Sequence, residues 1–116
     1  MFIENFPDEI ELLAFFESEP VYFERENVSF IYHVKDDHGF SIDFSFSIVE
    51  GWVHYVIKHG EVNVVDNSID GVGSLLLGKD TKGEYLYVEL NSNSFVSITE
   101  VRVAPYISIS GNVFSK

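Results

Sequence analysis

The sequence of 116 residues contains no cysteine, and it has only three prolines and one tryptophan. Without cysteine the chain can form no disulfide bond, no thiolate metal site and no cysteine nucleophile. It also lacks any run of about 18 apolar residues, and its first residues carry acids where a signal peptide would carry basic side chains. We therefore expect a cytoplasmic protein that neither enters nor crosses a membrane.

Basic side chains are scarce as well. Only 7 Lys and Arg face 19 Asp and Glu, for a formal net charge of −12. Such a charge repels nucleic-acid backbones and anionic lipids, and it speeds the approach of basic proteins. We therefore expect a basic protein partner, with no nucleic acid and no membrane. The alternative is that the charge only keeps a Phe-rich chain in solution.

Apolar residues, in contrast, are plentiful. They make up 46% of the chain, and aromatic residues make up 16%. A chain of this length buries roughly two-thirds of its unfolded surface, so it needs no metal or disulfide to hold a core. We expect a single domain over residues 1–116.

One helix is expected near the N-terminus, over about residues 8–18. Pro7 suits the first helical position, and Asp8 and Glu9 suit the positive end of the helix dipole. Pro20 follows the segment and marks its end. The apolar spacing predicts a buried face made of Ile10, Leu13, Ala14 and Phe16.

From about residue 20 to 115 the apolar pattern has a period of two, which is typical of β-strands. Strands are expected at 21–23, 28–34, 40–48, 52–58, 61–65, 74–77, 84–90 and 95–114. The last one changes phase, which predicts a bulge near Thr99 and Glu100 and an edge or a break at Pro105. The predicted fold is α+β and mostly antiparallel: one N-terminal helix packed on a curved sheet or sandwich of seven to nine strands.

The strands on either side of Glu50 and Gly51 predict a hairpin. A two-residue loop there would place Phe46 opposite Tyr55 on a buried face. The other pairs on that face would be Ile48 with Val53 and Phe44 with Ile57. The opposite, mixed face would pair Val49 with Trp52, Ser47 with His54, Ser45 with Val56 and Asp43 with Lys58.

Two segments resemble ligand-binding motifs without completing them. The segment 73–80 resembles a phosphate-binding loop, but Asp80 stands where Ser or Thr is needed. The segment 66–71 resembles the first half of a calcium loop, but Leu77 stands where a bidentate Glu is needed. We therefore expect an acidic turn at 66–71, with no cofactor and no metal.

The histidines leave an alternative open. Serines occur in no nucleophile motif, so we expect no enzyme. A pocket in which His33 and His54 converge would instead indicate a small-molecule-binding or enzymatic β domain. A long unpaired strand would indicate a structural or adaptor subunit that pairs through a sheet edge.

In general character the chain resembles the immunity proteins of bacterial toxin–immunity and contact-dependent inhibition systems. It is short, acidic, free of cysteine and rich in Phe and Tyr. The resemblance implies a cytoplasmic inhibitor that binds a cognate toxin domain, often a basic nuclease. It matches no signature residues and therefore assigns no functional positions.

The partner-binding surface is expected to combine acids of the turns and the mixed face with Trp52 and His54. The acids that would steer the partner are Asp36, Asp37, Asp43, Asp66 and Asp70. Tryptophan is the residue type most enriched at interface hot spots. The sequence leaves open whether Trp52 is such an anchor or belongs to the core.

Overall fold

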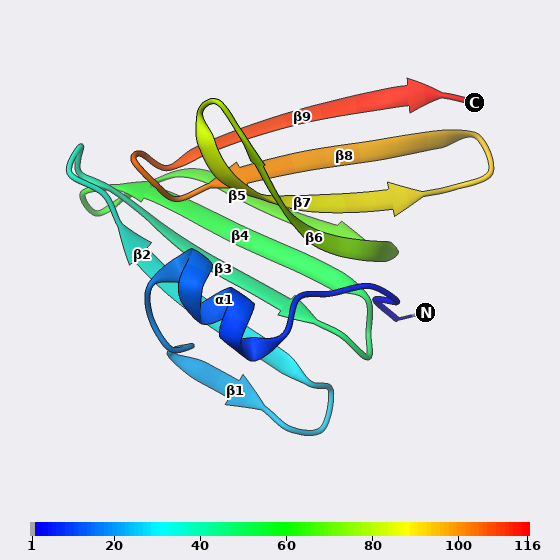
Figure 1. Ribbon diagram of the computed structural model, residues 1–116, viewed down its shortest axis with the longest axis horizontal. Helices are drawn as coiled ribbons and strands as arrows, with labels where there is room; N and C mark the ends of the chain where they lie inside the picture. The colour runs from blue at the N-terminus through cyan, green and yellow to red at the C-terminus, as the bar shows by residue number, and fades with distance from the viewer. Residues whose placement is uncertain (1) are drawn as a thin grey trace.

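Two antiparallel sheets and a short helix form the fold in a computed structural model, which describes residues 2–116 (Figure 1). In that range the elements are α1 (Glu9–Phe16), β1 (Tyr22–Glu24), β2 (Ser29–Lys35), β3 (Phe40–Ser47), β4 (Trp52–His59), β5 (Val62–Asp70), β6 (Val72–Asp80), β7 (Gly83–Asn91), β8 (Phe95–Arg102) and β9 (Ser108–Ser115). One sheet has the order β1-β2-β3-β4-β5 and the other β6-β7-β8-β9. The predicted fold class, α+β and mostly antiparallel, is confirmed.

The core lies between the inner faces of the two sheets, and α1 covers part of the five-stranded sheet (Figure 1). Aromatic rings fill the space below the helix. The Phe16 ring stacks on Tyr32 at 4.3 Å between centroids, and Phe30 stacks on Phe46 at 5.3 Å. The high Phe content therefore serves a single packed core.

The helix begins within one residue of its predicted start, but Pro7 lies before the N-cap residue Asp8 and not at the first helical position, and the helix ends at Phe16 rather than near residue 18. The Asp8 side chain accepts a hydrogen bond from the Glu11 backbone N–H at 2.8 Å, and the Glu11 side chain accepts one from the Asp8 N–H at 3.1 Å. This capping box satisfies two N–H groups that the helix leaves without partners.

The predicted buried face of the helix is wrong in most positions. Leu12, Phe15 and Phe16 are the buried residues. Ile10, Leu13 and Ala14 are exposed. Residues 12–16 are all apolar, so spacing alone does not select a face. The two phenylalanine rings bury the most surface, and they set the rotation of the helix.

The β3–β4 hairpin keeps its predicted faces but not its predicted pairs. Phe46 lies opposite Val53 rather than Tyr55, and Ser47 lies opposite Trp52, so the pairs are displaced by two residues. The connection is the four residues 48–51. Ile48 leaves the hairpin because its N–H donates to the Val28 carbonyl, and its own carbonyl accepts from the Ile3 N–H. A shift of two residues preserves the side of every side chain.

The C-terminal region differs more from the sequence prediction. It forms two strands, β8 and β9, and the loop between them contains Pro105, so the predicted break is confirmed. The predicted bulge near Thr99 and Glu100 is wrong, since both residues pair without a register shift. Thr99 shares the buried side with Val101, whereas the apolar Ile98 lies on the other side. The apolar alternation therefore changes phase in the sequence although the strand is regular.

The two motif-like segments are also strands. The acids of 66–71 lie in β5, and the acidic turn predicted there is wrong. The glycine-rich segment 73–80 lies in β6. Gly78 sits against the Tyr85 ring, where an added Cβ would come within 2.5 Å of a ring carbon. That glycine therefore makes room for an aromatic side chain on the neighbouring strand.

Asp36 ties the β2–β3 turn to the loop before β9. Its carboxylate accepts hydrogen bonds from the backbone N–H groups of His38 at 2.9 Å, Phe40 at 3.0 Å and Ile107 at 3.0 Å. Burial by itself would raise the pKa of Asp36, but the three donors outweigh it and hold the pKa below its ordinary value of 3.8.

Replacing Asp36 with alanine is expected to lower the free energy of unfolding by about 1–2 kcal/mol. Because the folded-state pKa is lowered, this contribution is present above pH 3.8 and is lost as the pH falls through the folded-state pKa. Urea unfolding measures it. The control is Asp37→Ala, which changes an exposed neighbouring carboxylate. Equal losses for the two variants would contradict the role of Asp36.

Candidate protein-binding surface

The five-stranded sheet has a face that points away from the core, here called the outer face. Its side chains alternate with the core-facing ones of β3 and β4, such as Phe46 and Val53, and three of its serines (Ser29, Ser45 and Ser47) are themselves buried. By the register, the outer face carries Tyr22, Glu24, Ser29, Ile31, His33, Lys35, Ser41, Asp43, Ser45, Ser47, Trp52, His54, Val56, Lys58, Asp66, Ser68 and Asp70. It belongs to the larger of the two sheets, which has five strands.

Most of the predicted partner-binding residues lie on the outer face: Asp43, Trp52, His54, Asp66 and Asp70. Trp52 pairs with Asp70 on one side and Ser47 on the other. It is half-buried on the side opposite to the core, so it is not a core residue.

The turn acids Asp36 and Asp37 are separate from the outer face. They follow the end of β2, in the β2–β3 turn. The Asp36 carboxylate is occupied by the three backbone donors described above. Asp37 is exposed beside it. The structure therefore brings together the strand acids but not the turn acids.

Two histidines on the outer face each contact one acid. The Nδ1 atom of His33 lies 2.6 Å from Asp43, and the Nε2 atom of His54 lies 2.7 Å from Asp66. Asp43 was predicted to lie opposite Lys58. In the structure Val56 lies opposite Asp43 on β4, and Asp43 contacts His33. The two contacts orient four side chains on adjacent strands.

Glu50 is a feature of this surface that the sequence reasoning missed. It accepts a hydrogen bond from the Trp52 indole N–H at 3.0 Å and one from the Asn27 side chain at 2.8 Å. These two bonds hold the pKa of Glu50 below its ordinary value, which keeps the group a carboxylate. Glu50 stands two residues before Trp52, at the start of β4, and this spacing was the sequence signal that could have indicated the hydrogen bond between them.

The charge of the outer face is one-sided. Among the described residues of the outer face, those that lie between the cross-strand pairs of Trp52 and those of Asp43 include acids but no Lys or Arg. Lys35 and Lys58 lie beyond this region, at one end of the sheet. The second sheet differs, because Arg102 contacts Asp80 at 2.5 Å and Glu100 at 3.8 Å. In residues 2–116 the acids of this region of the outer face therefore have no Lys or Arg partner, although Asp43 and Asp66 each contact a histidine.

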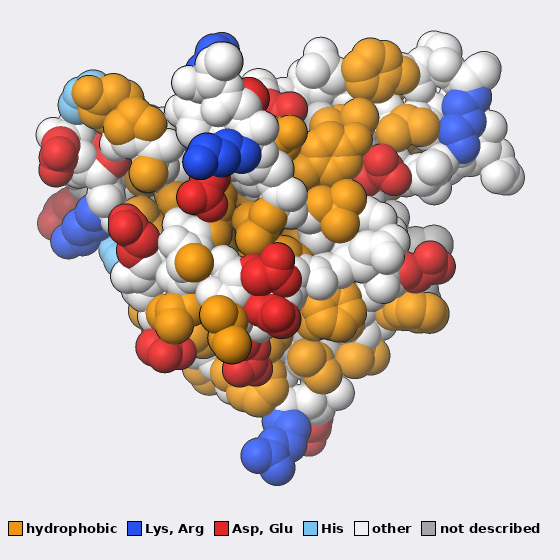
Figure 2. Space-filling model, in the orientation of Figure 1, with side chains coloured by type: hydrophobic (Ala, Val, Ile, Leu, Met, Phe, Trp, Pro, Cys, Tyr) orange, Lys and Arg blue, Asp and Glu red, His pale blue; other side chains and the backbone are white. Residues whose placement is uncertain are grey.

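The helix side of the molecule is a second acidic surface (Figure 2). Every charged residue from position 2 to 24 is an acid. Exposed apolar side chains lie among these acids, and they include Phe6, Ile10, Leu13 and Phe23. This surface combines charge with apolar contact, and it competes with the outer face as a candidate partner site.

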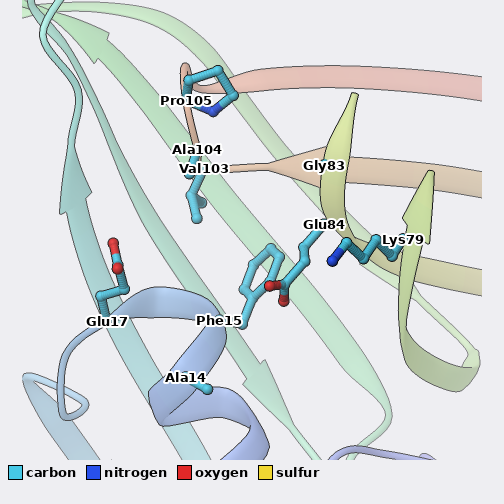
Figure 3. A pocket seen from close by; sticks show the side chains of 9 residues that line it. All are labelled: Ala14, Phe15, Glu17, Lys79, Gly83, Glu84, Val103, Ala104 and Pro105. Carbon is cyan, nitrogen blue, oxygen red and sulfur yellow. The ribbon is translucent and has the colours of Figure 1, made fainter. Parts of the chain in front are cut away.

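A hollow of about 350 Å³ lies between the end of α1, the β6–β7 hairpin and the loop after β8 (Figure 3). Its walls are largely apolar and include Phe15, Val103 and Pro105, with Glu17, Lys79 and Glu84 at the sides. Neither His33 nor His54 lines it.

The two histidines do not form a joint site. They lie on β2 and β4, with β3 between them, and each contacts a different acid. Within residues 2–116 no three His, Asp or Glu side chains gather as metal ligands would. In the same part of the chain, no helix is long and apolar enough to cross a membrane.

Comparison with known proteins gives one full-length similarity. No family model matches the sequence, and no curated protein matches it. The chain is similar to a chain in a solved structure described as a contact-dependent growth inhibition toxin–immunity protein complex from Klebsiella pneumoniae 342. The match has 49% sequence identity and a TM-score of 0.94, and it covers 98% of this chain and 100% of the other.

Proposed function

Because this chain belongs to the immunity proteins of contact-dependent growth inhibition systems, we propose that it neutralises a cognate toxin domain through the outer face of its five-stranded sheet. It is an inhibitor and not an enzyme. Its partner in this proposal is a basic toxin domain, and binding takes place in the cytoplasm.

The observation that carries the proposal is the gathering of Asp43, Asp66 and Asp70 with Trp52 and His54 on one regular sheet face. Acids in loops move with the loops, whereas these positions are fixed by strand pairing. A rigid surface loses little conformational freedom when it binds, and more of the contact energy therefore appears as affinity.

The proposed mechanism separates encounter from retention. A toxin that acts on nucleic acid needs Lys and Arg to hold phosphates, and the acids of the outer face offer the same charge as that substrate. They would draw the toxin in and occupy its basic surface. Trp52 would then be buried against the toxin, with its indole N–H already satisfied by Glu50.

Association with the toxin is expected to slow about tenfold or more as salt rises from about 50 mM to about 500 mM, because ions screen steering between exposed charges. The measurement is stopped-flow or surface binding with the cognate toxin domain. The dissociation rate is expected to change less than the association rate. An association rate that is indifferent to salt would show that the acidic surface serves solubility only.

A further inference from the structure

The sheet edges of this protein are protected unequally. An unpaired edge strand presents N–H and C=O groups that can pair with another chain, and proteins block such edges with short strands, charges, bulges or covering segments. Strand β1 has only three residues. Strand β5 carries Asp66 and Asp70, and a register shift interrupts its pairing with β4. On β6, the N-terminal segment pairs with Gly73 and Leu75 through Glu4 and Asn5.

Strand β9 has none of these protections. Its eight residues, Ser108–Ser115, include no charged residue and no proline, and they pair with β8 without a register shift. It is the outermost strand of its sheet (Figure 1). Val113 lies on the same side of the strand as the core-facing Ile109, yet its side chain is 70% exposed. In residues 2–116, nothing pairs with the free edge of β9.

The sequence of β9 is complementary to itself. In an antiparallel pair, directly opposite residues lie on the same face of the sheet. A two-fold axis must therefore pass between one residue and the same residue of the second copy. With the axis at Gly111, Ile109 of each copy lies opposite Val113 of the other, so this apolar pair forms twice. Two glycines meet at the centre, and Ser110 faces Asn112. This register covers Val113 with an apolar partner and opposes no like charges.

We infer that β9 pairs antiparallel with β9 of a second copy of this chain, around a two-fold axis at Gly111. The pairing joins two four-stranded sheets into one continuous sheet. It leaves the outer face of each five-stranded sheet uncovered, so it does not depend on where the toxin binds.

Charge decides the conditions under which this dimer forms. Each copy carries a net charge of −12, and the two bodies repel each other, although β9 itself is neutral. Salt screens repulsion between exposed charges. Self-association is therefore expected to strengthen with salt, whereas binding of the toxin is expected to weaken.

Sedimentation of the protein alone, over a concentration series in high salt, tests the pairing. The wild type is expected to shift from monomer to dimer, and Val113→Lys is expected to remain a monomer because a cation at the edge opposes pairing. The matched control is Val62→Lys, at a residue that is 65% exposed on the β5 edge. This control is expected to dimerise like the wild type. A monomeric wild type at every concentration, or equal dimerisation of both variants, would overturn the inference.

A cysteine experiment tests the register, because the chain has no cysteine of its own. Opposite residues of an antiparallel pair lie about 4.5–5.5 Å apart between Cα atoms, within disulfide range. Gly111→Cys is therefore expected to cross-link to itself under mild oxidation. A Cβ at this position meets the Ile98 carbonyl at 3.6 Å, an ordinary contact.

The control for the register is Ser115→Cys. Its two copies would be eight residue steps apart, roughly 26 Å, and should not cross-link. Efficient cross-linking at position 115 but not at 111 would overturn the two-fold axis at Gly111. A monomeric wild type whose affinity for the toxin is reduced by Val113→Lys would assign the edge to the toxin instead, and would also overturn the inference.

Discussion

Replacing Phe46 with alanine is expected to lower the free energy of unfolding by about 3–5 kcal/mol. The side chain is 0% exposed, and its ring contacts Phe30, Tyr32 and Phe44. The neighbouring rings are held by the sheet and the helix, so they cannot collapse fully into the cavity. Unfolding in urea, monitored by Trp52 fluorescence and by circular dichroism, measures the loss.

The control for this variant is Phe23→Ala. Phe23 lies on the short edge strand β1 and is 46% exposed, although its ring also touches Phe30 at 4.8 Å between centroids. We expect a loss of about 1 kcal/mol, because much of that ring is already in water. Similar losses for the two variants would mean that the stacked rings do not form the centre of the core.

Reversing both Asp66 and Asp70 to lysine is expected to lower the association rate with the toxin about tenfold or more at low salt. Both acids lie on the outer face along β5, and Asp66 is 60% exposed in its side chain. Charges at the rim act on encounter, so the dissociation rate should change much less. The same stopped-flow measurement separates the two rates.

A matched control carries the same change of net charge elsewhere. Glu84→Lys combined with Glu89→Lys reverses two acids on β7, in the second sheet. Overall charge alone would slow both double variants equally. The proposal expects the β5 variant to be slowed several times more than the β7 variant. Equal slowing would show that the overall net charge, and not the acids of the outer face, sets the association rate.

The sequence predicted the faces of the strands better than the pairs between them. Alternation along 40–48 and 52–58 put Phe46 and Tyr55 on the buried side, where they are. The register depends on the length of the turn, and that length was set by residues distant in sequence. Ile48 is held by Val28 and Ile3, which no local pattern could reveal.

The candidate site was predicted in part for the same reason. Asp43, Trp52, His54, Asp66 and Asp70 share one face because alternation assigns faces even when pairs are displaced. Asp36 behaves differently, since its role depends on a hydrogen bond to Ile107, far along the chain. The helix face was mispredicted because nearly every residue from 10 to 16 is apolar, and only packing distinguishes them.

The dissociation rate of the toxin complex, measured for Trp52→Ala and Ile10→Ala, tests the central claim most directly. Trp52 lies on the outer face, and Ile10 is 77% exposed on the competing helix side. If the outer face binds the toxin, Trp52→Ala should raise the dissociation rate about thirtyfold, equivalent to about 2 kcal/mol, and Ile10→Ala should leave it unchanged. A complex that is weakened by Ile10→Ala and indifferent to Trp52→Ala would contradict the account and place the toxin on the helix side.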